Sequence, residues 1–342
     1  MPRTLPLIYF YIPKKDHPSI GWPESINDYW SWMKICKVRY PGAESWTLQT
    51  YLHLKAANFP CELIDTLPDE GIVLAHSFSL PFNLKPSSKV LLICLRDDKK
   101  NHPYCQLHVV QNRHQALSKG LSSLWKSHYI PLWTQTKLTP RDETRGDRFE
   151  NIAYLGDISN LAPELREPSW KEQLEALGLR WITVGDTASW HDYSEMDAVL
   201  AIRSFSKCRY NNKPASKLYN AWRANVPAIL GCESAYQAER KSEFDYLEAD
   251  SVNVALSGLI KLRDNPEFRM AMVANGQIRA QEVQTEAILE SWHTFLMNKA
   301  VPMYYQWCET SPWLQQSFLR FRHYVYLKID GLNRREIFKI EL

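Results

Sequence analysis

The stretch AVLAIRSFSKCRYNNKPASKLYNAWRANVPAILGCE, residues 198–233, decides the fold class of this 342-residue chain. It opens and closes with short apolar runs, at 198–202 and 227–230, that have the length of buried strands. Between them lies an amphipathic stretch, 216–224, which predicts a helix. A strand, a helix and a second strand in this order indicate a βαβ unit, and therefore a parallel sheet.

Apolar runs alternate with longer amphipathic stretches through most of the chain, in two series. Helices are expected at 43–57, at 254–298 and at 170–177, the last with Ser169 as its N-cap. The strands that we expect are 7–11, 61–65, 72–76, 90–95 and 107–110, then 152–155, 181–184, 198–202 and 227–230. The sequence therefore predicts an α/β protein made of two doubly wound, Rossmann-like parallel-sheet domains.

The segment 129–148 separates the two series, because it is rich in proline and arginine and shows no hydrophobic period. A length of 342 residues, at roughly 150 residues per domain, also predicts two domains. We expect an N-terminal domain over 1–137, a C-terminal domain over 138–300 and a helical segment over 301–342 that packs back on the first domain.

The composition excludes several classes of protein. Lys+Arg 41 against Asp+Glu 38 gives a formal net charge of +3, which argues against a dedicated nucleic-acid binder. No run approaches the roughly 18 to 20 apolar residues of a membrane span, and the first residues resemble a strand more than a signal peptide. The seven cysteines show no Cys-x-x-Cys spacing, which favours free thiols in the cytoplasm over a zinc site.

The densest group of candidate binding residues follows the strand expected at 198–202. Arg203 comes directly after that strand, and Ser216 and Lys217 open the next helix. A helix start presents free N–H groups and a partial positive charge, so with these side chains it predicts a diphosphate-binding site. The alternative is an ordinary capped helix beside a solvated basic loop.

Two further strand ends in the second series carry candidate ligand contacts. Gly156 follows the strand at 152–155 and would let the backbone approach a ligand closely, because glycine has no Cβ. Glu233 could accept hydrogen bonds from ribose or sugar hydroxyls, or could be a first-turn acid of the next helix. The segment 186–197, which contains Trp190, could line a base pocket or form a short surface helix.

In the first series, two strand ends carry candidate catalytic residues. His76 and Asp97 each follow an apolar strand, where a side chain facing a cleft could act as a general base. Alternatively, His76 is not catalytic and Asp97 caps a turn. The chain lacks G-x-G-x-x-G after either first strand, the P-loop motif and G-x-S-x-G. It also has no Asp-x-Asp at a strand end, which argues against a metal-dependent site.

Five segments of the second series carry a family resemblance: RFENIAYLGD (148–157), DAVLAIRS (197–204), KPASKLYNAWRANVPAILGCESAY (213–236), LIKLRDNPEFRMAMVANG (259–276) and ILESWHTFL (288–296). On these segments, residues 149–297 resemble the donor-binding domain of glycosyltransferases with the GT-B fold. At 225 this chain has Asn where the family usually has Gly, and at 212 and 220 it has Asn where many retaining members have Glu.

The resemblance implies a nucleotide-diphosphate sugar as substrate, bound in an interdomain cleft, with no separate cofactor and no metal. Arg203 and Lys217 would hold the donor diphosphate, and Asn220 would bind the ribose. The N-terminal domain would bind the acceptor, and in an inverting enzyme His76 or Asp97 would deprotonate it. Whether the reaction retains or inverts the anomeric centre stays open.

The function expected on this basis is hexosyl transfer to a glycan or lipid-linked acceptor in the synthesis of surface polysaccharide or glycoconjugates. The alternatives are a degenerate GT-B-like binding module and a nucleotide-sugar epimerase. Residues 311–342 mix basic and aromatic side chains, which suits either a terminal helix packed on a domain or a peripheral contact with the inner face of the membrane.

Overall fold

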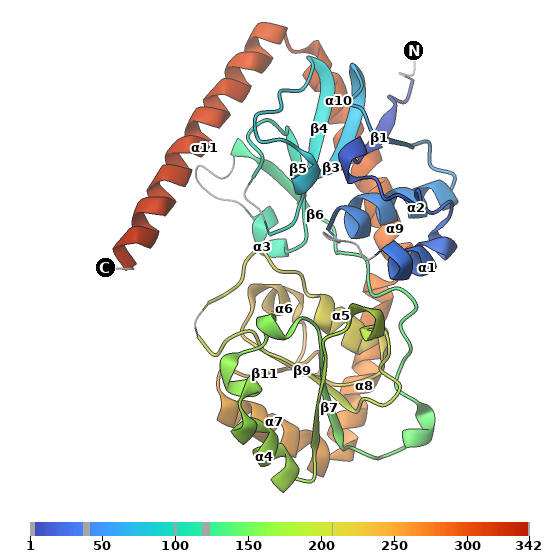
Figure 1. Cartoon of the computed structure of the whole chain (residues 1–342), viewed down its shortest axis with the longest axis vertical. Coiled ribbons are helices and arrows are strands. Elements are labelled where there is room, and N and C mark those ends of the chain that lie inside the picture. Colours follow the sequence, from blue (N-terminus) through green and yellow to red (C-terminus); the bar gives the residue numbers. More distant parts are fainter. Residues whose placement is uncertain (1–3, 37–41, 99–100, 118–123, 207, 341–342) are drawn as a thin grey trace. The chain divides into compact units, whose positions relative to one another are not determined.

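The computed structural model describes residues 4–36, 42–98, 101–117, 124–206 and 208–340, with side chains up to Ile329. The chain forms two compact units, each assembled from separate stretches of sequence (Figure 1). Unit 1 comprises Met1–Gln111, Gln115–Ile130 and Leu289–Leu342, and unit 2 comprises Asn112–His114 and Pro131–Ile288. The C-terminal residues therefore belong to the same unit as the N-terminus.

Unit 1 is built on a six-stranded sheet in which every pairing is parallel, in the order β2-β1-β3-β4-β5-β6. The central strands are buried along nearly their whole length, as expected for a sheet covered on both faces. The strands are β1 (Ile8–Tyr11), β2 (Glu62–Ile64), β3 (Glu70–His76), β4 (Lys89–Arg96), β5 (Leu107–Val110) and β6 (Lys126–Tyr129).

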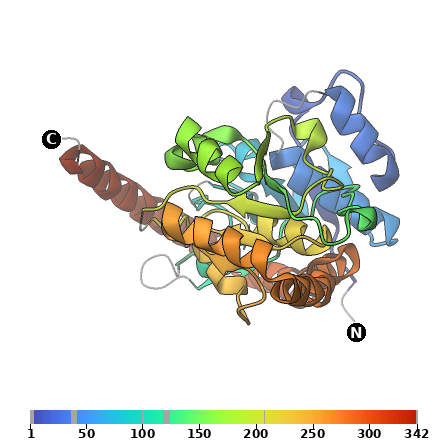
Figure 2. The same cartoon turned by 90° about the horizontal axis from the view of Figure 1, so that it is seen from below.

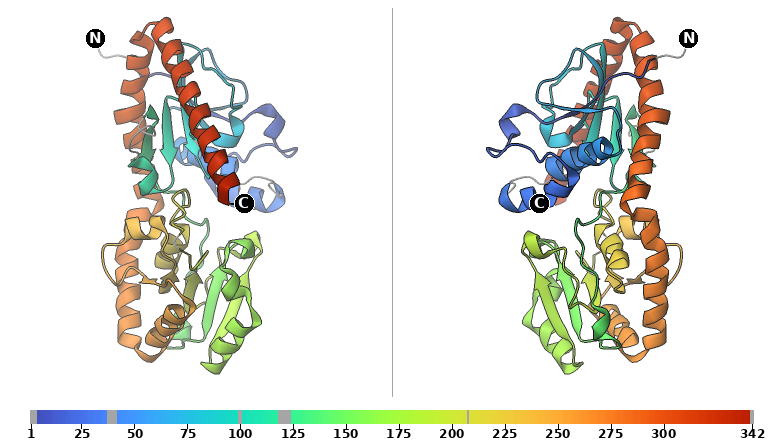
Figure 3. Two further views of the ribbon diagram at one scale, coloured as in Figure 1. Left: turned by 90° about the vertical axis from the view of Figure 1, so that its left-hand side faces the viewer. Right: turned by 90° about the vertical axis from the view of Figure 1, so that its right-hand side faces the viewer.

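The helices of unit 1 come from both ends of the chain. The π-helical turn Ala43–Leu48 runs into α2 (Gln49–Ala56), and this turn packs against β1 and β3. From the C-terminal part, α10 (Val301–Glu309) packs against β3 and β4. Helix α11 (Pro312–Ile340) then turns back along the same unit (Figures 1 and 3). Helix α1 (Ile26–Cys36) also belongs to unit 1, whereas α3 (Arg113–Ala116) begins in the Asn112–His114 stretch of unit 2 and ends in unit 1.

Unit 2 is built on a five-stranded sheet, again parallel throughout, in the order β11-β10-β9-β7-β8. From β7 the chain goes to β8 on one side and then returns to β9 on the other, so the strand order reverses between β7 and β9. The strands are β7 (Asn151–Leu155), β8 (Arg180–Val184), β9 (Ala198–Ala201), β10 (Ala228–Leu230) and β11 (Leu247–Glu248).

Helices cover both faces of the unit 2 sheet (Figures 2 and 3). Helix α4 (Pro168–Ala176) packs on β8, whereas α5 (Ser216–Arg223) and α7 (Val252–Asp264) both contact α8 (Pro266–Ala280). Helix α6 (Ser234–Glu239) follows β10, and α9 (Thr285–Phe295) carries the chain back into unit 1. One continuous cluster of buried apolar side chains joins α4, α5, α6, α7 and α8 to the sheet.

Helix α5 ends in a Schellman motif that explains the residue at position 225. The Asn225 N–H donates to Trp222 O at 3.3 Å, and the Val226 N–H donates to Ala221 O at 3.1 Å. Asn225 has φ 58°, in the left-handed region, where asparagine is tolerated better than other residues with a side chain. Asparagine therefore takes the conformation for which the resembled family uses glycine.

The fold class predicted from the sequence is confirmed: each unit is a parallel-sheet α/β structure, and helices end the chain. Ser169 is not an N-cap, because α4 begins at Pro168 with Glu167 in the cap position. The sequence predicts domain boundaries at 137 and 300, and the units of the structure divide at Ile130 and Ile288. The second boundary differs because the chain returns to unit 1 within α9, before residue 300.

All seven cysteines are free, as expected from their spacing. Among the described residues, no helix has the length and apolar character that crossing a membrane requires.

Candidate functional site

The candidate donor site lies in unit 2 where the strand order reverses between β7 and β9. Doubly wound sheets bind ligands at the carboxyl ends of the strands at such a point. Gly156 follows β7 directly, and Arg203 comes two residues after β9. Lys217 reaches the same place from the first turn of α5. The structure thus brings together three of the residues that the sequence singled out.

Lys217 is a cation that has no counter-ion among the residues described by the structure. Its Nζ donates a hydrogen bond to the Leu155 carbonyl at the end of β7, and it lies 5.1 Å from the ring centroid of Trp190 and 5.9 Å from that of Tyr154. In the described part of the chain no carboxylate forms an ion pair with it. Burial, and then the nearby Arg203 guanidinium, lower the pKa of Lys217 from 10.5 to about 8. An anion placed here would therefore be strongly favoured.

Glycine at position 156 makes room for this lysine. A Cβ built on Gly156 would lie 3.0 Å from Tyr154 Oη and 3.1 Å from Lys217 Nζ, closer than ordinary van der Waals contact. Tyr154 Oη and Lys217 Nζ fill the space that a Cβ would take, so Gly156 is buried and the ammonium group packs directly against its backbone. Because the Gly156 N–H already donates to Val184 O at 3.0 Å, the close approach of a ligand to this backbone stays a prediction without support from its position.

Arg203 is held in place by two hydrogen bonds. Its Nε donates to Glu233 Oε2 at 3.0 Å, and its Nη1 donates to Asn160 Oδ1 at 2.7 Å. Among described residues its Nη2 has no acceptor. The side chain is 18% exposed, so this remaining edge of the guanidinium is available to a ligand.

Glu233 is more buried than the sequence suggested, with a relative exposure of 2%. Its Oε2 accepts from Arg203, but its Oε1 is buried and has no hydrogen-bond partner within the described chain. Burial raises the pKa of Glu233, although the Arg203 guanidinium opposes that rise. The residue stands at the N-cap of α6, yet its side chain makes no capping hydrogen bond.

The start of α5 is not capped by any side chain. Ser216 is its first residue and is partly exposed, and Ala215 occupies the N-cap position. The free N–H groups of this eight-residue helix and the partial charge of its dipole therefore add to the charge of Lys217. The predicted diphosphate-binding role of Ser216 stays a prediction that this geometry supports.

Asn220 is not brought into this group. It is 6% exposed, and its Oδ1 accepts a hydrogen bond from the Gln135 N–H at 3.2 Å. No hydrogen bond in the described chain joins it to Arg203, Lys217 or Glu233. The amide therefore ties α5 to the segment that enters unit 2, and its role in ribose binding stays a prediction without support from its position.

Three further side chains contact the site residues, and the sequence had pointed to only one of them. Trp190 was singled out as a base-pocket candidate, and the structure places its ring over Lys217, with its Nε1 donating to Val184 O at 2.8 Å. Tyr154 and Asn160 were not expected. The only sequence signal for Tyr154 was its place in β7, two residues before Gly156.

In unit 1, His76 and Asp97 lie together at the ends of β3 and β4. His76 Nε2 is 3.8 Å from Asp97 Oδ2, and Gln111 Nε2 donates to Asp97 Oδ1 at 3.0 Å. Burial raises the pKa of Asp97, but its interactions with His76 and Gln111 outweigh this and the net shift is downward.

The two members of this pair differ in accessibility. His76 is fully buried, its Nδ1 accepts the Phe78 N–H, and a Cβ on Gly42 would lie 2.7 Å from its Nε2. Asp97 is 30% exposed. Of the two predicted bases, only the Asp97 carboxylate can contact a bound molecule in this structure, and His76 would act through it.

No family model and no curated protein matches this chain. Among solved structures the chain is similar to HepE of Anabaena in complex with UDP, at 11% identity and a TM-score of 0.47, over 85% of this chain and 100% of that chain. It is also similar to AviGT4, a glycosyltransferase involved in avilamycin A biosynthesis, at 12% and 0.45, over 86% and 99%. The pneumococcal O-GlcNAc transferase GtfA in complex with UDP and GlcNAc matches at 13% and 0.47, over 75% and 60%.

Proposed function

We propose that this protein is a glycosyltransferase whose donor is a nucleotide-diphosphate sugar, bound at the switch point of unit 2. One observation carries the proposal: the ammonium of Lys217, which has no counter-ion in the described chain, lies at an uncapped helix start and packs against Gly156 at the end of β7. A cation beside the free N–H groups of a helix start makes a site for phosphate groups.

The chemistry proposed for this site is stabilisation of the leaving diphosphate. Negative charge grows on the diphosphate as the bond to the sugar breaks. Lys217 and the free edge of Arg203 would stabilise that charge from fixed positions, which is electrostatic preorganisation. These groups supply positive charge without a metal, so metal-independent transfer is part of the proposal.

The unpaired Oε1 of Glu233 supports its predicted contact with a ribose or sugar hydroxyl. A buried acceptor without a donor costs roughly 1 to 3 kcal/mol, and a ligand hydroxyl would recover part of that cost. A small movement of the surrounding side chains has to accompany this contact, because the atom is covered in the free protein.

The acceptor is proposed to be a glycan or a lipid-linked glycan, in the synthesis of surface polysaccharide or glycoconjugates. If the reaction inverts the anomeric centre, Asp97 is the proposed base and His76 its positioning partner. If the configuration is retained, neither residue is required for that step.

The first experiment is a thermal-shift series with UDP, GDP, ADP, CMP and dTDP, each with magnesium and with EDTA. A ligand at a hundredfold excess over its dissociation constant stabilises the native state by about 2.7 kcal/mol. We expect one nucleotide to raise the melting temperature equally with and without magnesium, and Lys217→Ala to abolish that rise. Lys171→Ala, an exposed lysine on α4, is the matched control. A folded Lys217→Ala protein that binds as tightly as wild type would refute the site.

The second candidate function is a degenerate binding module that holds a glycan without transferring sugar. It is favoured by the position of Asn220, whose side chain is committed to Gln135 and not to the site. Glycan binding without hydrolysis or transfer from any donor would select this alternative. Epimerisation of a free nucleotide sugar in the absence of an acceptor would instead indicate an epimerase.

A further inference from the structure

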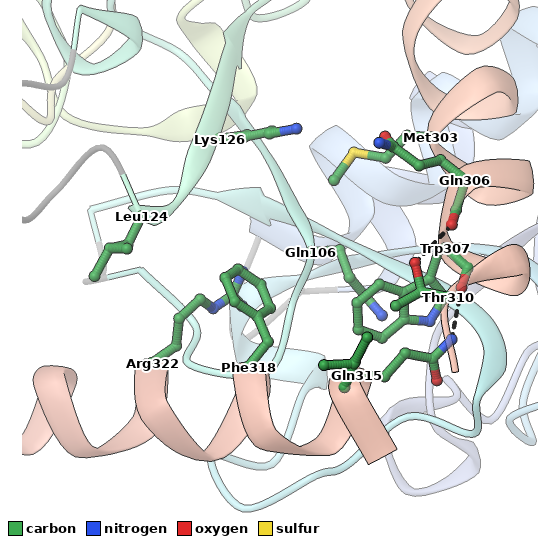
Figure 4. A pocket seen from close by; sticks show the side chains of 11 residues that line it. Gln106, Leu124, Lys126, Met303, Gln306, Trp307, Thr310, Gln315, Phe318 and Arg322 are labelled. Atoms are coloured by element: carbon green, nitrogen blue, oxygen red, sulfur yellow. Dashed lines mark hydrogen bonds between the residues drawn. The ribbon is translucent and has the colours of Figure 1, made fainter. Parts of the chain in front are cut away.

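Unit 1 contains a cavity of about 360 Å³ against the inner side of α11, far along the chain from the residues of the donor site. Its volume is within the range of small-molecule pockets, roughly 300 to 1,000 Å³. The walls come from the residue before β5, from the start of β6 and the residues before it, and from α10, α11 and the turn between them (Figure 4). The lining residues are Gln106, Leu124, Lys126, Met303, Gln306, Trp307, Thr310, Leu314, Gln315, Phe318 and Arg322.

The lining combines apolar walls with positive charge. The side chains of Leu124, Met303 and Phe318 give it a long apolar surface, while Lys126 and Arg322 are both cationic (Figure 4). None of the described residues that line the cavity is acidic. Such a lining is complementary to a molecule that has an apolar chain and a negative head.

Arg322 is the most informative of these residues. Its side chain is 1% exposed, and its Nε and Nη2 donate to the carbonyl oxygens of Pro103 and Cys105. No carboxylate in the described part of the chain pairs with it. Burial lowers the pKa of Arg322 to about 10, so the guanidinium still carries its charge at neutral pH. The guanidinium lies 5.8 Å from the ring centroid of Trp125 and 5.2 Å from that of Phe318, which offsets part of the cost of burying its charge, and an anionic ligand would offset more of it.

A purely structural role explains only part of this arrangement. The hydrogen bonds from Arg322 to Pro103 and Cys105 connect α11 to the loop before β5. A neutral hydrogen-bond donor would be sufficient for this connection, so it does not explain the charge. The cavity beside the guanidinium contains one unsatisfied buried donor among the described residues of its lining, the indole Nε1 of Trp307. A buried donor without an acceptor in this lining points to an absent acceptor group.

We propose that this cavity binds a single-chain amphiphile with an anionic head group, the chain lying along the apolar wall and the head paired with Arg322. Lys126, which is exposed, adds attraction at the rim. The open side of the cavity is apolar too, because Leu314 and Phe318 are 52% and 41% exposed. The chain of such a ligand would cover these side chains. This site is independent of the function proposed above.

The test is isothermal titration of the full chain with decyl phosphate and with decanoate, each below its micelle concentration. Decyltrimethylammonium is the control of opposite charge. We expect 1:1 binding of both anions and none of the cation. The ratio of the affinities for the phosphate and the carboxylate distinguishes a lipid phosphate from a free fatty acid as the natural ligand. Binding to phosphatidic acid vesicles but to neither monomer would overturn the cavity site in favour of a membrane surface.

Three substitutions complete the test. Arg322→Gln should weaken binding roughly 10- to 100-fold, as expected for the loss of a charge-assisted contact. Met303→Trp, which fills the cavity without touching Arg322, should abolish it, and the exposed Lys328→Gln on α11 should leave it unchanged. If Arg322→Gln does not fold, Met303→Trp decides. Wild-type affinity in a folded Met303→Trp protein, or equal affinity for the cation, refutes the proposal, and nucleotide binding measured on the same samples keeps the two proposals apart.

Discussion

Lys217 should make nucleotide-diphosphate binding depend on pH in a range where an ordinary lysine would not. The perturbation is a rise in pH from 7 to 9. Burial lowers the pKa of Lys217 to about 8, and only its protonated form pairs with a phosphate. In the free protein the ammonium loses its proton as the pH rises through this value. Affinity should therefore fall with rising pH, because binding above pH 8 must take up a proton.

The magnitude follows from the titration of one group. With a pKa of about 8, the protonated fraction falls from about 0.9 at pH 7 to about 0.1 at pH 9, so the affinity should fall about tenfold. A lysine with the ordinary pKa of 10.5 would stay about 97% protonated at pH 9, and the affinity would hardly change. The two cases differ by about 1.4 kcal/mol in binding free energy at pH 9.

The assay is isothermal titration calorimetry of the tightest-binding nucleoside diphosphate at pH 7, 8 and 9, in buffers of different ionisation enthalpy. The comparison of buffers reports directly how many protons are taken up. Lys217→Arg is the matched variant, because its guanidinium stays charged throughout this range. It experiences the same titration of the ligand, so the ratio of the two proteins isolates the lysine.

A wild-type affinity that changes with pH no more than that of Lys217→Arg would refute the reasoning, and so would an affinity that rises with pH. The first result would mean that Lys217 is not in contact with the diphosphate or that its pKa is ordinary. The second would mean that the neutral amine is the binding form.

Three other predictions test the packing at Gly156, the end of helix α5 and the role of Asp97. Gly156→Ala should weaken diphosphate binding about tenfold with little change in melting temperature, because its Cβ would displace the Lys217 ammonium; unchanged affinity by titration contradicts this. Asn225→Ala should lower the free energy of unfolding in urea by about 1 kcal/mol and Asn225→Gly should not, since only alanine is strained at φ 58°; equal stabilities would contradict the Schellman assignment. If transfer is inverting, Asp97→Asn should lower kcat by roughly 100-fold or more, and the wild-type rate should be flat from pH 5 to 7, below the titration of Lys217, because the lowered pKa keeps the Asp97 carboxylate ionised; an acid limb near pH 6 would point to another base.

Much of the fold could be predicted from hydrophobic period alone. The central strands β3, β4, β7 and β9 are continuous apolar runs, because both faces of a parallel sheet are covered. The strands that we missed, β6 (Lys126–Tyr129) and β11 (Leu247–Glu248), lie at sheet edges, where one side is open and polar residues are allowed. Their sequences carry no apolar run, so no local pattern distinguishes them from loops.

The core of the candidate site was also within reach of the sequence. Parallel strands place their carboxyl ends at one edge, so Gly156 and Arg203 had to lie near each other once the βαβ pattern was established. Lys217 follows because it opens the helix that leaves that edge. Chain order and strand direction are sufficient for this, and both can be read from one sequence.

What only the tertiary structure decided is which side chains are buried and with what they are paired. The hydrophobic period of a sequence cannot show that Glu233 accepts a hydrogen bond from Arg203 or that Asn220 accepts one from Gln135. Nor can it show that His76 is buried next to Asp97. Each of these depends on contacts between segments distant in the sequence, and the free energy of burying a polar group is set by its partners rather than by its neighbours along the chain. The cavity beside Arg322 is the clearest case, because its walls come from residues some 200 positions apart.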